Sequence, residues 1–130
     1  MIVVDASALA PALADDGPDG DSARARLRGQ SLAAPELIDL ETTSVIRRQL
    51  LSGHLDARRA ELAVGDLTDL PLRRAPHRPL LHRCWELRQN LTAYDAAYVA
   101  LAELLELVLV TADARLAAAP GPRCRIDLLD

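Results

Sequence analysis

The sequence predicts a three-layer α/β/α fold with a mostly parallel central sheet. Short apolar, β-branched runs alternate along the chain with longer segments in which apolar residues have helical spacing. Clusters of Gly, Pro and Asp separate several of these segments. An order in which strands and helices alternate favours parallel strand pairing, with helices on both faces of the sheet.

The first half of the chain opens on a strand, because the run IVV is apolar and β-branched. The segment from Ala14 to Ser22 is rich in Gly, Pro and Asp and predicts a loop. Pro35 suits a helix start, Glu36 complements the helix dipole, and Gly53 suits a helix end. The predicted elements of this half are strands at Ile2 to Asp5 and Ser31 to Ala34, and helices at Ala6 to Ala14, Asp21 to Arg28 and Pro35 to Ser52.

In the second half, Leu62, Ala63, Leu67 and Leu70 recur at helical spacing, and Pro71 ends that helix. The run LVLVT predicts a strand. The predicted elements of this half are helices at Asp56 to Leu70, Pro79 to Gln89, Thr92 to Leu105 and Ala114 to Ala119, and strands at Leu72 to Ala75, Val108 to Thr111 and Cys124 to Leu128. No internal repeat or long linker divides them, so we expect a single domain.

The composition of the chain excludes several functional classes of protein. A chain of 130 residues that is 50% hydrophobic has the size and composition of one globular domain. We expect a soluble, cytoplasmic protein, because no apolar stretch reaches the roughly 18 residues that span a bilayer. All 15 basic residues are arginine, and the absence of lysine excludes a P-loop and a Schiff-base enzyme. The net charge of -4 means that nucleic-acid binding would require a local arginine patch.

Four acidic residues occupy positions that are typical of a metal site. Asp5 ends the first strand, Asp95 opens an alanine-rich helix, and Asp113 follows the run LVLVT. Glu41 interrupts an apolar helical stripe, where an unpaired charge is costly. Because the carboxyl ends of parallel strands share one edge of a sheet, where open α/β folds bind ligands, we expect these acids to converge there.

Each acid also has a structural explanation. Asp5 and Asp113 could be helix N-caps, and Asp95 could form a capping box with Thr92. An arginine could pair with Glu41 in the core-facing stripe. These structural roles would all have to apply together to remove the case for a metal site.

Ligands that are all oxygen atoms predict Mg²⁺, with Mn²⁺ as a possible substitute. Zinc would require clustered His or Cys, and no such spacing joins His54, His77 and His82 to one another or to the two cysteines. Carboxylate-bound Mg²⁺ can activate a water and neutralise a phosphodiester, so phosphodiester hydrolysis is the predicted reaction.

Four segments of the chain resemble the successive motifs of the PIN-domain ribonucleases of the VapC toxin family. They are VVDASAL, PELIDLETTSVIRR, LTAYDAAYVALAELL and LVLVTADARL. The resemblance covers nearly the whole chain and implies one PIN domain over residues 1–130. It further implies a magnesium-dependent endoribonuclease that cleaves structured RNA, either tRNA or rRNA, as the toxin of a type II toxin–antitoxin system. A cognate VapB antitoxin would silence it.

Residue by residue, the resemblance assigns the family's four acids to Asp5, Glu41, Asp95 and Asp113. All four are candidate metal ligands and catalytic residues, with Asp5 and Asp95 as the direct ligands. Ser7 and Thr111 match small hydroxyl positions beside the site. A receiver domain would need a lysine, and a haloacid-dehalogenase-like phosphatase would need a second acid at Ser7, so neither class fits. The alternative from a different class is a catalytically silent PIN-like module that binds protein or RNA.

The candidates for RNA contact are the arginines nearest to the acids in sequence, Arg47, Arg48, Arg88 and Arg115. Aromatic residues make up only 2% of the chain, which favours recognition of RNA shape and phosphates over stacking on single strands. The acidic segment Asp15 to Asp21 is less suited to RNA approach. We expect a homodimer, and an antitoxin helix that docks near Ala8 to Leu13 and the helix after Ser22.

Overall fold

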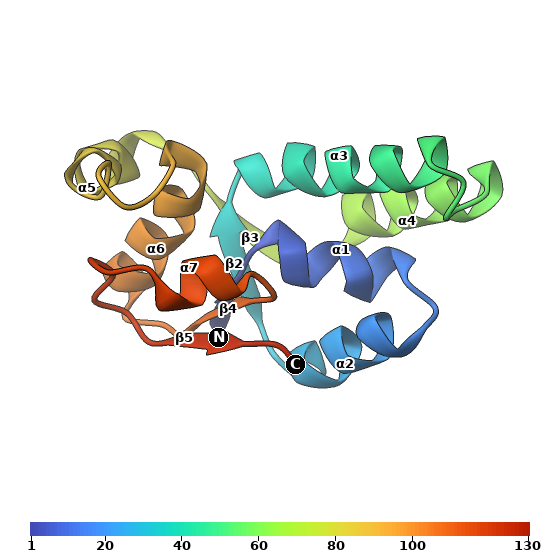
Figure 1. The fold of residues 1–130 in the computed structure, drawn as a ribbon, viewed down its shortest axis with the longest axis horizontal. Coiled ribbons are helices and arrows are strands. Elements are labelled where there is room, and N and C mark those ends of the chain that lie inside the picture. Colours follow the sequence, from blue (N-terminus) through green and yellow to red (C-terminus); the bar gives the residue numbers. More distant parts are fainter.

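The computed structural model describes residues 1–130 and is built around a five-stranded parallel sheet (Figure 1). The strands lie in the order β3-β2-β1-β4-β5, and every neighbouring pair is parallel. Their bounds are β1 Ile2–Val4, β2 Leu32–Pro35, β3 Leu72–Ala75, β4 Leu109–Thr111 and β5 Ile126–Leu128. The predicted α/β fold class is confirmed, and the sheet is wholly rather than mostly parallel.

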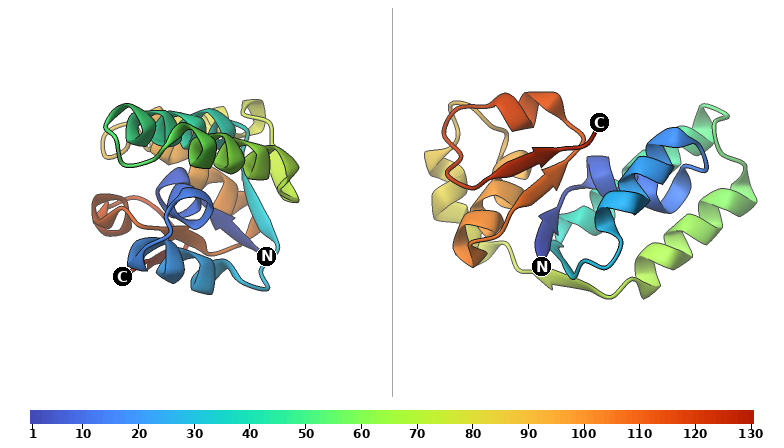
Figure 2. Two further views of the ribbon diagram at one scale, coloured as in Figure 1. Left: turned by 90° about the vertical axis from the view of Figure 1, so that its right-hand side faces the viewer. Right: turned by 90° about the horizontal axis from the view of Figure 1, so that it is seen from below.

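Helices fill every connection between strands. Their bounds are α1 Ala6–Ala14, α2 Pro18–Leu27, α3 Leu37–Leu51, α4 Ala57–Asp69, α5 Leu81–Glu86, α6 Ala93–Leu105 and α7 Ala114–Ala118, with a short 3₁₀ turn at Arg78–Leu80 before α5. Because parallel crossovers are right-handed, α1 to α4 cover one face of the sheet and α5 to α7 the other. The right-hand view of Figure 2 shows these two groups on opposite sides of the strands. None of the helices is long and apolar enough to cross a membrane.

Helix α6 is embedded in the core. All residues from Ala96 to Ala102 are buried, and the helix packs against β1, β2 and β4. Four of these residues are alanines, whose small side chains let the helix lie close to the sheet. The N-terminal end of α6 is therefore held firmly over the carboxyl ends of the central strands.

Several predicted boundaries differ from the structure by two or three residues, among them the end of α5, which is Glu86 and not Gln89, and the start of β5, which is Ile126 and not Cys124. Helix α2 begins at Pro18, within the predicted loop, because proline suits the first turn and Asp19 and Asp21 complement the helix dipole there. Pro35 ends β2, where it lies in parallel register with Ala75, and Glu36 takes the N-cap position of α3. In the absence of a side-chain cap from Glu36, Nε2 of His77 accepts a 3.0 Å hydrogen bond from the Leu37 N–H.

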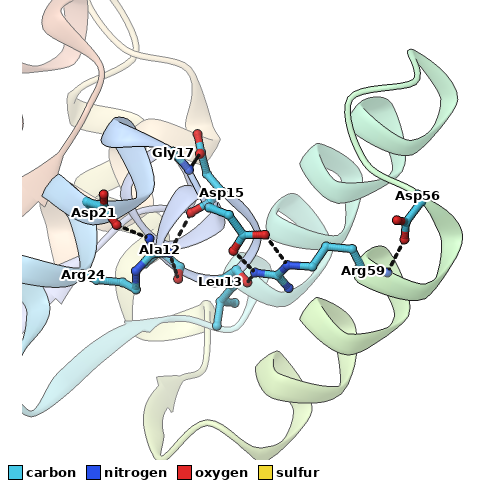
Figure 3. Close-up of polar contacts among 9 residues, drawn as sticks. Ala12, Leu13, Asp15, Gly17, Asp21, Arg24, Asp56 and Arg59 are labelled. Atoms are coloured by element: carbon cyan, nitrogen blue, oxygen red, sulfur yellow. Dashed lines mark hydrogen bonds and ion pairs between the residues drawn. The ribbon is translucent and has the colours of Figure 1, made fainter.

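Two arginines hold the C-terminal end of α1, as Figure 3 shows. Arg24 of α2 donates to the carbonyl oxygens of Ala12 and Asp15 at 3.2 and 2.7 Å. Arg59 of α4 donates to the carbonyl oxygen of Leu13 at 2.8 Å. Cations near these otherwise unpaired carbonyls stabilise the helix end and join α1, α2 and α4.

Candidate metal and catalytic site

The candidate site lies where the order of the strands reverses. Strands β1 and β4 are neighbours at the centre of the sheet, and the chain moves outward from them in opposite directions. The crevice beyond the carboxyl ends of two such strands is the usual ligand site of an open α/β sheet. Asp5 follows β1 directly, and Ala112 and Asp113 follow β4.

Asp5 is held by three donors, two from the first turn of α1 and one from the end of β4. Its Oδ1 accepts hydrogen bonds from the Ser7 hydroxyl at 2.7 Å and the Ala8 N–H at 3.2 Å. Its Oδ2 accepts one from the Thr111 hydroxyl at 2.5 Å. The side chain of Ser7 also accepts a 2.9 Å bond from the Ala112 N–H. The two hydroxyl positions named from the sequence therefore both lie at the site and fix the carboxylate of Asp5.

Glu41 enters the site from α3. Its Oε1 accepts a 2.6 Å hydrogen bond from the hydroxyl of Tyr98, a residue of α6. No arginine pairs with it: Arg74, the arginine that reaches this part of α3, binds Asp39 with a shortest distance of 2.7 Å. The arginine ion pair that would have given Glu41 a purely structural role is therefore absent.

The other two acids cap or begin helices. Oδ1 of Asp113 accepts a 2.9 Å hydrogen bond from the Arg115 N–H and caps α7. The Asp95 N–H donates to the Thr92 hydroxyl at 3.1 Å in the first turn of α6. The capping interactions proposed from the sequence therefore exist for Asp5 and Asp113, and Thr92 caps α6. They do not exclude metal binding, because a cap occupies only one carboxylate oxygen or uses only the backbone.

The acids influence one another electrostatically. Burial raises the pKa of Asp5, which is 5% exposed, against the lowering effect of its hydrogen bonds, and the charge of Asp95 raises it further. Burial also raises the pKa of Glu41, and Asp95 and Asp5 add to that rise. Burial raises the pKa of Asp95, with a further contribution from Asp113 and opposition from Arg115. The four residues named from the sequence thus share one electrostatic environment.

Asp5, Glu41 and Asp95 have no cationic partner. None of them takes part in the ion pairs of the structure, and Asp113 only meets Arg115 at 3.8 Å. A cation bound among them would relieve both repulsion and desolvation. Nevertheless, no three His, Cys, Asp or Glu side chains are placed closely enough to hold a metal ion together. The donor set fits an open, water-rich Mg²⁺ site that uses one or two carboxylates, and it does not form a closed cage.

The four candidate arginines fall into two groups. Arg48 lines an open pocket together with Glu41, and the side chain of Arg115 is 95% exposed beside Asp113. In contrast, Arg47 lines a groove between α3 and α4, and Arg88 lies over the ring of Trp85 at 4.6 Å from its centre. Of the four, Arg48 and Arg115 are therefore the two that lie next to a candidate acid, Arg48 in the same pocket as Glu41 and Arg115 in contact with Asp113.

Tyr98 also lies at the site, although it is not among the residues predicted from the sequence. Its side chain is 1% exposed, and its only polar atom meets a site carboxylate. The available signal was a tyrosine one turn after Asp95 on a helix that is otherwise Ala-rich and apolar. A buried tyrosine needs an acceptor for its hydroxyl, and here the acceptor is a candidate metal ligand.

Comparison with known families identifies the class of protein that has this fold and these acids. The family model described as the PIN domain matches residues 2–122. Ribonuclease VapC1 of Mycobacterium tuberculosis is 44% identical over 128 residues, which cover 98% of this chain and 96% of that protein. The chain belongs to the VapC ribonuclease family of PIN domains.

Two solved structures support the fold. The crystal structure of Mycobacterium tuberculosis VapC20, described as a toxin that cleaves the sarcin–ricin loop, matches with a TM-score of 0.71 at 16% identity, covering 91% of this chain and 94% of VapC20. The crystal structure of VapBC2 from Rickettsia felis, bound to a promoter DNA fragment, matches with a TM-score of 0.66 at 14% identity and covers both chains fully. At these identities the likeness concerns the fold alone.

Proposed function

We propose that the protein is a magnesium-dependent endoribonuclease that acts as the toxin of a VapBC toxin–antitoxin system. One observation carries the proposal: across the switch point of the sheet, the charge of Asp95 raises the pKa values of Asp5 and Glu41, and none of these three acids forms an ion pair with an arginine or histidine. Such unpaired acids are costly to a fold and are typical of functional sites. Membership of the VapC family makes RNA hydrolysis the natural use of this arrangement.

Asp5 and Asp95 are the proposed direct ligands of Mg²⁺, with Glu41 and Asp113 completing the acidic rim. Mn²⁺ could substitute, because it prefers the same oxygen ligands. Bound there, the ion would supply charge stabilisation to the phosphodiester and lower the pKa of a water. Ser7 and Thr111 keep the Asp5 carboxylate fixed in one orientation through their hydroxyl groups.

The proposed substrate is structured RNA, of the tRNA or rRNA class. Arg48 shares a pocket with Glu41 and Arg115 contacts Asp113, so both arginines could bind phosphates of an RNA that reaches the acids. Trp85, Tyr94 and Tyr98 are the only aromatic residues, and Tyr98 is buried, so stacking on several bases is not available. Sequencing of RNA ends after a pulse of expression would identify the cleaved RNA.

The acidic segment after α1 is no barrier to this proposal. Asp16 pairs with Arg59 at 3.1 Å and Asp21 with Arg24 at 2.7 Å, so much of its negative charge is neutralised locally. These contacts also lie near the C-terminal end of α1, whereas Asp5 caps its N-terminal end.

The proposed partner is a VapB-type antitoxin that places a basic side chain at the acids. The charge of the site supports this, because a cationic side chain would occupy the position that Mg²⁺ requires. The docking position expected from the sequence stays a prediction. Within it, Ala8, Leu9 and Ala10 of α1 are buried, so only the half-exposed residues Pro11, Ala12 and Leu13 of that stretch could contact the antitoxin. Co-purification with the product of the neighbouring gene, with suppression of cleavage, tests the partnership.

We also propose that the protein forms a homodimer. Leu81 and Tyr94 are exposed apolar side chains that line one groove between α5 and α6, and Trp85 is exposed nearby on α5. A second copy could cover these side chains, which are otherwise a solubility liability. Analytical ultracentrifugation would show a species of twice the monomer mass if this is so.

A catalytically silent PIN module is the second candidate. The observation in its favour is that no three acids are already placed to hold a metal ion. A silent module would bind protein or RNA without divalent-cation-dependent cleavage, whereas the nuclease requires the ion.

Cleavage assays on four proteins test the proposal. The wild type should cleave RNA with Mg²⁺ and lose that activity with EDTA. Asp5→Asn and Asp95→Asn should abolish cleavage while retaining the fold, because the amides keep size but lose the charge that attracts the ion. Asp66→Asn is the matched control, since Asp66 is exposed on α4 and outside the site. Near wild-type cleavage by either site variant would refute the assignment, and a wild type that binds RNA without cleaving it would favour the silent module.

A further inference from the structure

Two carboxylates of the site, the buried Asp5 and the half-buried Glu41, are held by very different numbers of hydrogen bonds. Asp5 accepts three hydrogen bonds, from the side chains of Ser7 and Thr111 and from a backbone N–H. Glu41 accepts one, and its donor is the hydroxyl of Tyr98 at 2.6 Å. A glutamate also has one more rotatable bond than an aspartate, so Glu41 has more freedom and less restraint.

Repulsion would drive Glu41 out of the site if nothing held it. Its carboxylate faces the charges of Asp95 and Asp5, and no arginine or histidine pairs with it. The open pocket along α3 provides space into which the side chain could turn. The hydroxyl of Tyr98 is therefore the one hydrogen-bond donor that opposes such a movement.

Tyr98 is well placed to be that donor. It lies one turn after Asp95 on α6, and its ring is fixed in the core at 1% exposure. Because packing immobilises the ring, the hydroxyl is presented at a constant position. Helix α6 thus carries the carboxylate of Asp95, and its Tyr98 hydroxyl contacts the carboxylate of Glu41 on α3.

We propose that Tyr98 is a positioning residue that holds Glu41 in the metal-binding arrangement. The inference rests on the proposed function, since it assigns Tyr98 a role in that same site. Hydrogen-bond partners of metal ligands typically contribute roughly 10- to 100-fold to metal affinity or activity. A purely structural tyrosine would instead contribute through its ring, and loss of its hydroxyl would leave cation binding unchanged.

The first test measures Mn²⁺ binding by electron paramagnetic resonance, together with RNA cleavage. Tyr98→Phe retains the buried ring and should weaken Mn²⁺ binding roughly 10- to 100-fold, with a matching fall in cleavage at limiting metal. Tyr94→Phe is the matched control on the same helix: Tyr94 is 65% exposed, and the phenylalanine keeps the ring that lines the α5–α6 groove while it removes a hydroxyl that contacts no acid, so Mn²⁺ binding should not change. Rescue of cleavage in Tyr98→Phe by high Mn²⁺ would further support a positioning role.

A double-mutant cycle tests whether Tyr98 acts through Glu41. In a Glu41→Gln background, the additional change Tyr98→Phe should alter Mn²⁺ affinity by less than about twofold, because the group it orients is already changed. An undiminished effect of Tyr98→Phe in that background would overturn the inference. So would wild-type Mn²⁺ affinity in Tyr98→Phe.

A measurement on the native side chain covers the case in which Tyr98→Phe fails to fold. The chain contains only two tyrosines, so ¹³C-labelled tyrosine gives two signals that Tyr94→Phe assigns. Addition of Mg²⁺ should shift the Tyr98 signal, and Glu41→Gln should remove that response. An unresponsive Tyr98 in a wild type that binds Mn²⁺ and cleaves RNA would overturn this inference alone, whereas a wild type without Mn²⁺ binding would overturn the proposed function as well.

Discussion

The hydroxyl of Thr111 donates a hydrogen bond of 2.5 Å to Oδ2 of Asp5, across 106 positions of the sequence. The same hydroxyl oxygen accepts a 3.0 Å bond from the Asp113 N–H. Thr111 therefore joins the ends of β1 and β4 and connects the first and last acids of the site. Because it is fully buried, it has no water to replace either bond.

Substitution of Thr111 should cost stability, and Thr42 offers a matched control. Both threonines are 0% exposed, but the hydroxyl of Thr42 has no hydrogen-bond partner. Thr111→Val removes a bond to a carboxylate and leaves a donor unpaired, so we expect a loss of about 1.5 to 3 kcal/mol in the free energy of unfolding. Thr42→Val should be neutral or stabilising by about 1 kcal/mol, because it removes an unsatisfied polar group. Urea denaturation measures both, and equal losses would contradict the contrast.

Relief of carboxylate repulsion should appear in thermal melts. With EDTA present, Asp95→Asn should melt at a higher temperature than the wild type, because burial and the charge of Asp113 both disfavour the ionised Asp95 side chain. Mg²⁺ at ten times Kd should stabilise the wild type by about 1.4 kcal/mol, or roughly 2 to 6 °C, and should stabilise Asp95→Asn less. Asp66→Asn should behave as the wild type in both conditions. A full Mg²⁺ shift in Asp95→Asn, or an equal loss in Asp66→Asn, would show that Asp95 is not a ligand.

Two glycine-to-alanine substitutions in helices should have opposite effects. A Cβ on Gly20 of α2 would lie 1.8 Å from the Asp15 carbonyl oxygen, which cannot move away easily because Arg24 binds it. We expect Gly20→Ala to destabilise by about 1 to 3 kcal/mol. A Cβ on Gly65 of α4 would meet nothing within 4 Å, so Gly65→Ala should stabilise by about 0.5 to 1 kcal/mol through helix propensity. Melting temperatures that move in the same direction would be inconsistent with this packing.

The pH dependence of stability should reveal the ion pair of Glu103. Burial acts to raise the pKa of Glu103, but bonds from Arg83 at 2.7 Å and from the Arg123 N–H at 2.8 Å, with the charges of both arginines, lower it overall. A lowered folded-state pKa stabilises the protein above the unfolded-state value, near 4.5, and this contribution disappears as the pH falls through the folded-state pKa. Glu103→Gln should therefore cost roughly 1 to 2 kcal/mol at pH 7 and progressively less as the pH falls.

Glu61→Gln is the control for that experiment. Glu61 is exposed on α4 and forms no ion pair, so its substitution should change stability little at either pH. A cost for Glu103→Gln that is the same at pH 3 and pH 7 would mean that charge is not its cause.

The sequence by itself determined the order and type of the elements. Local signals were sufficient for α1, α4 and α6, because Asp5, Asp56 and Thr92 act as caps within three residues of the N–H groups they bind. The sequence also identified the four acids, the two hydroxyl positions and the family. The predicted start of α2 is too late, because glycine and proline usually indicate a loop. Here Gly20 lies inside α2, where its lack of a side chain lets the helix approach the end of α1.

Only the tertiary structure decided which side chains support those acids. The bonds from Tyr98 to Glu41 and from Thr111 to Asp5 join residues 57 and 106 positions apart, and no local pattern encodes such pairings. The same holds for Arg74, which pairs with Asp39 and leaves Glu41 without a cation. Distances between distant segments follow from the strand order and helix packing, and these depend on the total burial of the chain rather than on any short stretch of it.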